Sequence, residues 1–180
     1  MADVPRNVNV VAELGEKGSV SFSMTGAGVS GEKIEFDKNT TNGMKKSEHY
    51  LVAFTLDDNT GLGLRYVRPK DDAMWVKVVA DPDDPTCPAP HLNLPQFKAI
   101  NCTDTVLTVR NKDEIREYLK FALNFIRSNG NDKNPAEYVQ YDPIGDNRNG
   151  GVTTRSNPVL LAVIVVVVIT AVATKLLRLW

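Results

Sequence analysis

The chain has 180 residues, a length that suits one domain with an appendage. Its 21 lysines and arginines nearly balance 22 aspartates and glutamates, so it lacks the basic surplus of a nucleic-acid-binding domain. Regular apolar alternation interrupts its polar stretches, which excludes a wholly disordered chain.

Short strands are predicted from residue 8 onward. Apolar side chains occupy alternate positions in 8–14, 20–24 and 34–36. The same alternation runs through 49–67 on both sides of the turn-forming segment Asp-Asp-Asn-Thr-Gly, so this stretch predicts a β-hairpin. Two denser apolar runs, 74–80 and 105–110, indicate further strands.

The segment 115–127 fits two patterns. A helix would align Ile115 with Leu119 and Leu123, whereas a strand would align Leu119 with Phe121 and Leu123. The tight turn before the segment and the strands around it favour a strand, and its good helix propensity keeps the helix as an alternative.

These elements predict an all-β fold, because no alternation of strands with helices indicates a parallel α/β sheet. About seven short strands separated by turns are typical of an immunoglobulin-like antiparallel β-sandwich. We expect this domain to occupy residues 1–127.

The composition changes at residues 128–157, which are rich in asparagine and glycine and predict a flexible linker. As a free coil, the linker would reach on the order of 30 Å. Four larger apolar side chains leave an alternative open, in which the segment docks onto the domain or a partner. They are Tyr138, Val139, Tyr141 and Ile144.

A membrane anchor is the strongest prediction. Residues 158–174 carry no charge and would span roughly 25 Å as a helix, close to the about 30 Å of a bilayer core. Lys175 can snorkel, which extends the predicted transmembrane helix over 158–177 and leaves a short tail at 178–180. The anchor residues are Pro158, Val159, Leu160, Leu161, Val163, Ile164, Val168, Ile169, Lys175 and Trp180.

The localisation follows from the amino-terminal segment, 1–15, which has no apolar run and does not resemble a secretory signal. We therefore expect a cytoplasmic sandwich and a helix that inserts after synthesis as a tail anchor. Membrane lipid and other membrane protein subunits are the expected partners. The small residues available for helix packing are Ala162, Thr170, Ala171 and Thr174.

Residues 26–31 match the dinucleotide-binding pattern G-x-G-x-x-G. That pattern needs a helix after its last glycine, and the strand predicted at 34–36 leaves no room for one. We therefore predict a glycine-rich hairpin loop. Cys87 and Cys102 are expected to be reduced thiols in the cytoplasm, with a disulfide as the alternative in an oxidising compartment.

Metal ligands and catalytic groups are sparse. Cys87, His91 and His49 resemble part of a copper ligand set, but no methionine follows His91. The acidic residues of 57–58 and 81–85 are expected to be solvated charges, with a calcium site as the weaker alternative. No nucleophile motif is present, so we predict no cofactor, no metal and no enzyme activity.

Four phrases of the sequence, at 72–78, 105–111, 121–125 and 141–144, together resemble the DP-EP family of uncharacterised bacterial proteins. The resemblance covers about residues 50 to 151. The chain has Asp-Pro pairs but no Glu-Pro pair. The resemblance implies a bacterial source and a β domain, and it implies no activity.

The function predicted from these features is that of a non-catalytic accessory or structural subunit of a larger membrane complex. Two alternatives remain open. One is a membrane-tethered module that binds a ligand with its sandwich, and the other is a metal-binding or enzymatic domain. A monomer in detergent would favour the binding module, and bound metal would favour the last alternative.

Overall fold

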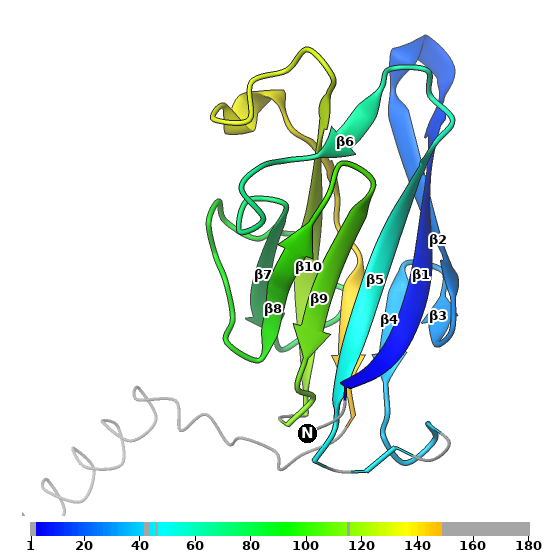
Figure 1. Ribbon diagram of the computed structural model, residues 1–180, viewed down its shortest axis with the longest axis vertical. Coiled ribbons are helices and arrows are strands. Elements are labelled where there is room, and N and C mark those ends of the chain that lie inside the picture. Colours follow the sequence, from blue (N-terminus) through cyan, green and yellow to red (C-terminus); the bar gives the residue numbers. More distant parts are fainter. Residues whose placement is uncertain (1–2, 42–43, 46, 115, 149–180) are drawn as a thin grey trace, which may run out of the picture.

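A computed structural model describes residues 3–41, 44–45, 47–114 and 116–148. In these residues the chain forms two β-sheets that face each other across one hydrophobic core (Figure 1). The first sheet has the strand order β2-β1-β5-β9-β8, made of β1 (Asp3–Leu14), β2 (Val20–Gly26), β5 (His49–Asp58), β8 (Phe97–Cys102) and β9 (Val106–Asn111).

The second sheet is built around the long strand β10 (Glu117–Arg127), which pairs with β6 and β7 on one side and with β11 and β12 on the other. Strands β4 and β3 follow β12. Its members are β3 (Val29–Ser30), β4 (Lys33–Phe36), β6 (Leu64–Tyr66), β7 (Met74–Val79), β10, β11 (Val139–Tyr141) and β12 (Ile144–Asn147). Two 3-10 turns, η1 (Glu16–Gly18) and η2 (Pro135–Glu137), lie in the connections.

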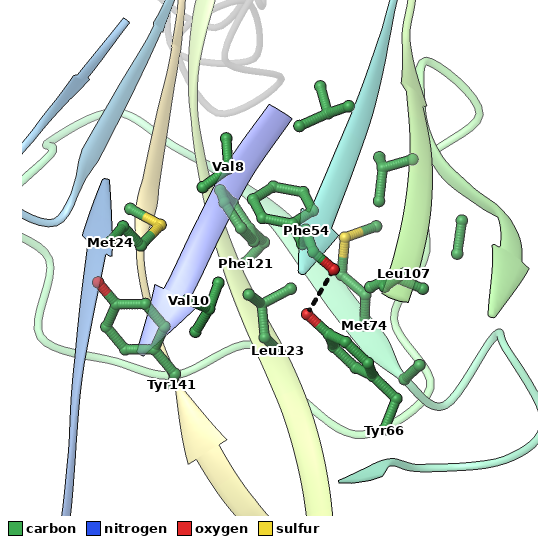
Figure 2. Packing of buried hydrophobic residues seen from close by; sticks show 14 of the residues in the cluster. Val8, Val10, Met24, Phe54, Tyr66, Met74, Leu107, Phe121, Leu123 and Tyr141 are labelled. Carbon is green, nitrogen blue, oxygen red and sulfur yellow. Dashed lines mark hydrogen bonds between the residues drawn. The ribbon is translucent and has the colours of Figure 1, made fainter. Parts of the chain in front are cut away.

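The core confirms most of the alternation that the sequence predicts. Val8 and Val10 of β1 point toward Phe121 and Leu123 of β10 (Figure 2). Buried aromatic rings join the two sheets, with the ring centroids of Phe54 and Phe121 5.7 Å apart. Leu14, expected to continue the buried face of β1, is 51% exposed because it lies at the end of that strand.

The predicted all-β class is confirmed, and 115–127 contributes a strand rather than a helix. The antiparallel arrangement is wrong in part, because both sheets are mixed: β1 pairs with β5 in parallel, and so does β12 with β4. Each parallel pair joins strands that are far apart in sequence, so no local turn signal indicates it.

The predicted hairpin at 49–67 does not form. Strand β5 lies in the first sheet, whereas β6 pairs with β10 in the second. The Asp58 carboxylate organises the crossing: Oδ1 accepts the Thr60 amide at 3.0 Å and Oδ2 accepts the Leu64 amide at 2.7 Å. Residues 57–61 do form a turn, as their composition predicts, but a turn can carry the chain from one sheet to the other as well as reverse it within one sheet.

The predicted boundary at residue 127 is also wrong, because β11 and β12 belong to the second sheet. Tyr141 is 5% exposed, and its ring stacks on Phe22 with centroids 5.3 Å apart. The docking alternative is therefore confirmed for residues 139–147. The remaining part of the predicted linker, 149–157, lies outside the described residues.

Candidate functional site

The outer face of the second sheet brings together three of the side chains that the sequence singles out, namely Cys87, His91 and Asp84. Residues that alternate with the core positions of β7 and β10 point to this face, and the connection between β7 and β8 contacts them. We call this group the outer-face cluster. It consists of Asp72, Trp75, Lys77, Asp84, Thr86, Cys87, His91, Lys120, Asn124, Tyr138, Gln140 and Asp142.

Two lysines form the middle of the cluster. Lys77 and Lys120 lie directly opposite each other on β7 and β10, an arrangement in which like charges repel. Asp84 relieves this repulsion, because its Oδ2 lies 3.1 Å from Lys77 Nζ and its backbone carbonyl accepts Lys120 Nζ. Lys77 Nζ also donates to the Thr86 hydroxyl. Asp84 and Thr86 thus hold the acidic part of the connection between β7 and β8 against the sheet.

The pKa of Asp84 is lowered to about 2, first by the Thr86 hydroxyl, which donates to Oδ1 at 2.6 Å. The Thr86 amide and Lys77 lower it further. The carboxylate is therefore ionised at all physiological pH values. Its oxygens already accept hydrogen bonds from the protein, so this aspartate holds the connection between β7 and β8 in place.

Cys87 extends the cluster toward β11. Its Sγ lies 3.3 Å from Asp142 Oδ1 and 3.8 Å from Gln140 Oε1. Burial, the hydrogen bond to Asp142 and the charge of that carboxylate raise the pKa of Cys87 to about 12. The thiol is therefore protonated at neutral pH, which suppresses nucleophilic attack and metal ligation. Cys87 and Cys102 are both free thiols.

His91 and Asp72 form a close pair at the rim of the cluster. The His91 Nδ1 atom lies 2.5 Å from Asp72 Oδ1, and the ring meets Trp75 edge-on with centroids 5.9 Å apart. The ring of Trp75 in turn packs against that of Tyr138, with the ring centroids 5.7 Å apart. His91 has a φ of 61°, a left-handed conformation that is uncommon outside glycine. The carboxylate therefore holds an exposed imidazole in one orientation.

Asn124 is the buried hub of the cluster. Its Nδ2 donates to the Asp72 carbonyl at 2.8 Å, and its Oδ1 accepts Gln140 Nε2 at 2.9 Å. Its backbone N–H donates to the Ala73 carbonyl, and its backbone carbonyl accepts the Val67 amide. The only sequence signal for this role is a single amide within the apolar run of β10, which is too weak to predict it.

The structure separates the other predicted candidates. His49 begins β5 in the first sheet, with its ring nitrogens 3.9 Å from Asp3 and 3.8 Å from Glu114, so it does not join Cys87 and His91. Across the described ranges, no group of three or more His, Cys, Asp or Glu side chains is placed to hold a metal ion. The predicted hairpin loop at 26–31 does not form, because these residues carry the chain from β2 in the first sheet to β3, which pairs with β4 in the second. A strand follows the last glycine, so the helix that the dinucleotide-binding pattern needs is absent there.

One shallow depression of about 370 Å³ lies beside the cluster, at the far end of β10. Its lining includes Arg127 and Glu137. The pKa of Glu137 is lowered, first by the Asn131 amide that it accepts. The Glu137 carboxylate thus holds the loop before it in place by accepting the Asn131 amide.

The predicted anchor and helix-packing residues, 158–180, lie outside the described residues. Within the part of the chain that is described, no helix is long and apolar enough to cross a bilayer. Compared with known proteins, the chain matches no protein-family model and no curated protein. The resemblance to the DP-EP family therefore stays a prediction.

Proposed function

We propose that the chain is a non-catalytic accessory subunit of a membrane protein complex, with an immunoglobulin-like sandwich held in the cytoplasm by a tail anchor at 158–177. The observation that carries the proposal is the uncharged apolar run 158–174, which begins a short distance after the last strand of the sandwich, β12 (Ile144–Asn147). Two facing sheets around one core support the immunoglobulin-like assignment.

The outer-face cluster supports a structural role for the sandwich. Its lysines, Asp84 and Asn124 bind one another or the backbone, and Cys87 is held protonated. These contacts hold the connection between β7 and β8 against the sheet. They also engage the ammonium groups of Lys77 and Lys120 in hydrogen bonds within the chain. A fixed surface of this kind suits docking to a partner protein.

The strands also limit the distance between the sandwich and the bilayer. Strand β12 ends at Asn147, so only 149–157 separates the last described residue from the predicted anchor. Nine residues span at most about 30 Å when fully extended. Strand β1 begins at the same end of the molecule, where Asp3 Oδ2 lies 2.8 Å from Arg110 (Figure 1). We therefore expect this end to face the membrane.

Two measurements test the proposal. Alkaline carbonate should leave the full chain in the membrane pellet and should release a chain truncated after residue 157. On a native gel in mild detergent, the full chain should migrate in a band of several hundred kilodaltons. Migration near 19.8 kDa, or as a pair of copies alone, would refute the subunit role. Release of the full chain by carbonate would refute the anchor.

Packing of the predicted helix on partner helices has its own test. Replacing Ala162 or Ala171 with leucine would enlarge the small-residue positions and should dissociate the chain from the complex while leaving it in the pellet. Val167→Leu is the matched control, since it changes size at a position outside the small-residue set.

A further inference from the structure

The free edge of β2 is the least protected strand edge in the described part of the molecule. Strand β2 ends the first sheet and pairs with β1 in an unbroken ladder from Val20–Leu14 to Gly26–Val8. Figure 1 shows it along one flank of the sandwich. Alternate backbone N–H and C=O groups of a terminal strand point away from the sheet and are ready to pair with another strand.

The other edges carry features that block such pairing. Strand β8, at the far side of the same sheet, exposes Lys98 and has a bulge between Ala99 and Asn101. The edge of β7 is covered where the Val76 amide donates to the Leu92 carbonyl at 2.8 Å. Strands β3 and β11 have only two and three residues. Short strands, bulges and edge lysines all prevent edge-to-edge association.

Strand β2 has none of these features. Its sequence, Val-Ser-Phe-Ser-Met-Thr-Gly, contains no charge and no proline. Ser21, Ser23 and Thr25 point outward and are exposed, while Val20 and Phe22 face inward and are only partly buried. A further strand beside β2 would therefore cover apolar surface on the inner side without desolvating a charge.

We propose that β2 pairs antiparallel with β2 of a second copy of this chain, across a two-fold axis at Ser23. A two-fold axis perpendicular to the strands makes two copies of one edge antiparallel, so the seven residues of β2 pair with themselves. In this register Ser21 lies opposite the second copy's Thr25, and Phe22 lies opposite its Met24. The hydroxyl residues stay on the outer face and the apolar residues on the inner face.

The second copy fits this edge for two reasons. The register is self-complementary, since every outward residue of β2 meets another small hydroxyl residue and no like charges meet. Next to Val20, Leu14 of β1 is 51% exposed, one of two large apolar side chains that the described residues leave so accessible. A continuous sheet through both copies would shield this corner.

The pairing has a geometric consequence that rests on the proposed anchor. Strand β1 begins and β12 ends at the same end of the molecule, and antiparallel pairing turns these ends of the two copies in opposite directions (Figure 1). Two anchored copies would then sit on facing membranes rather than side by side in one bilayer. Carbonate extraction reports on the anchor separately, so failure of the anchor and failure of the pairing are distinguishable.

Disulfide trapping of the full chain in detergent tests the register, in a Cys87→Ser background that removes the more accessible native thiol. Ser23→Cys should form a disulfide-linked dimer under mild oxidation, because directly opposed residues have Cβ atoms about 5 Å apart. Ser21→Cys alone should not, because it lies four residues, or roughly 13 Å, from its own copy. Ser21→Cys combined with Thr25→Cys should restore the link. A link through Ser21→Cys alone would overturn the antiparallel register.

A charge placed at the axis tests the pairing itself by light scattering of the full chain in detergent, after it has been purified away from every other subunit. The wild type should have about twice its 19.8 kDa mass, and Ser23→Lys and Ser23→Glu should each restore 19.8 kDa. Mixing these two variants should recover the dimer, and Ser30→Lys, on the exposed face of β3, should leave it intact. A monomeric wild type, or a dimer that survives Ser23→Lys, would overturn the proposal.

Discussion

Strands β5 and β10 are nearly equal in length and lie in opposite sheets, yet they are buried in different ways. Along β5, buried residues alternate with more accessible ones, so only one face meets the core. Along β10, eight consecutive residues from Leu119 to Ile126 are buried. The inner residues of β10 contact the first sheet, and its outer residues lie under the outer-face cluster.

The difference explains why one strand was readable from the sequence and the other was ambiguous. A strand with one covered face shows a period of two, whereas a strand covered on both faces becomes a continuous apolar run that resembles a buried helix. In β10, the outer face is covered by polar contacts, in which Lys120 and Asn124 are buried with their partners. The second sheet therefore has an apolar core on one side and a mixed layer on the other, where these buried polar groups lie among Trp75, Ala122 and Ile126.

The largest effect should follow from a change on the inner side of β10. Phe121 is fully buried, and its ring lies 5.7 Å from Phe54 and 5.2 Å from Phe97. Phe121→Ala would leave a cavity between the sheets and should lower the free energy of unfolding by about 3 to 5 kcal/mol. Urea unfolding measures this change, with Thr55→Ala on the exposed side of β5 as control. A loss below about 1 kcal/mol would show that the two sheets do not share this core.

A smaller loss is expected on the outer side. Asn124→Ala would leave the Gln140 amide and the Asp72 carbonyl without their buried partner and should cost about 2 kcal/mol. Asn101→Ala, at an exposed position of β8, provides the control in the same urea measurement. Equal stability of the two variants would mean that the outer contacts contribute little, and that β10 depends on its inner side alone.

The fold was predictable where burial is one-sided and local. The alternation at 8–12 and 50–56 identified core residues correctly, because a strand fixes the face of every second side chain. The parallel pairings were not predictable, since nothing local in β1 specifies β5 as its neighbour. Strand β12 was missed because Gly145 and Asp146 are typical of turns, although both are buried. Strand β11 was missed because it has only three residues in a stretch rich in asparagine.

The candidate site was predictable only as separate residues. The sequence singled out Cys87, His91 and the acidic segment, but it did not indicate Lys77 and Lys120 as their neighbours. These lysines meet through the register of β7 with β10, a long-range property of the sheet. The copper ligand set failed for the same reason, because His49 lies on β5 in the opposite sheet.

A more local effect is expected from Asp84, which fastens the connection between β7 and β8. Asp84→Asn would remove the charge that Lys77 contacts, and amide exchange in 81–92 should become faster while the midpoint of global unfolding changes little. Asp57→Asn is the matched control at an exposed position. Unchanged exchange in 81–92 would show that other contacts hold the connection.

The contacts of Asp84 that hold the connection between β7 and β8 should weaken in acid. The pKa of Asp84 is about 2 in the folded chain, below its usual value of 3.8, so folding is favoured by its ionised form. Its contribution is complete above the unfolded pKa and is lost as the pH falls from about 4 to 2. The protection of 81–92, which is its exchange rate relative to that of the unfolded chain at the same pH, should therefore fall across this interval in the wild type and fall less in Asp84→Asn.

The smallest change is a shift in thiol reactivity without a change in fold. The pKa of Cys87 is raised to about 12 by burial first, and then by the hydrogen bond and charge of Asp142. Asp142→Asn removes the charge, so the pKa should fall but stay above its usual value of 9, because burial remains. In a Cys102→Ser background, alkylation by iodoacetamide at pH 9 should become several-fold faster, since the thiolate is the reacting form. An unchanged rate would mean that burial alone raises the pKa of Cys87, and that the Asp142 carboxylate contributes nothing to its low reactivity.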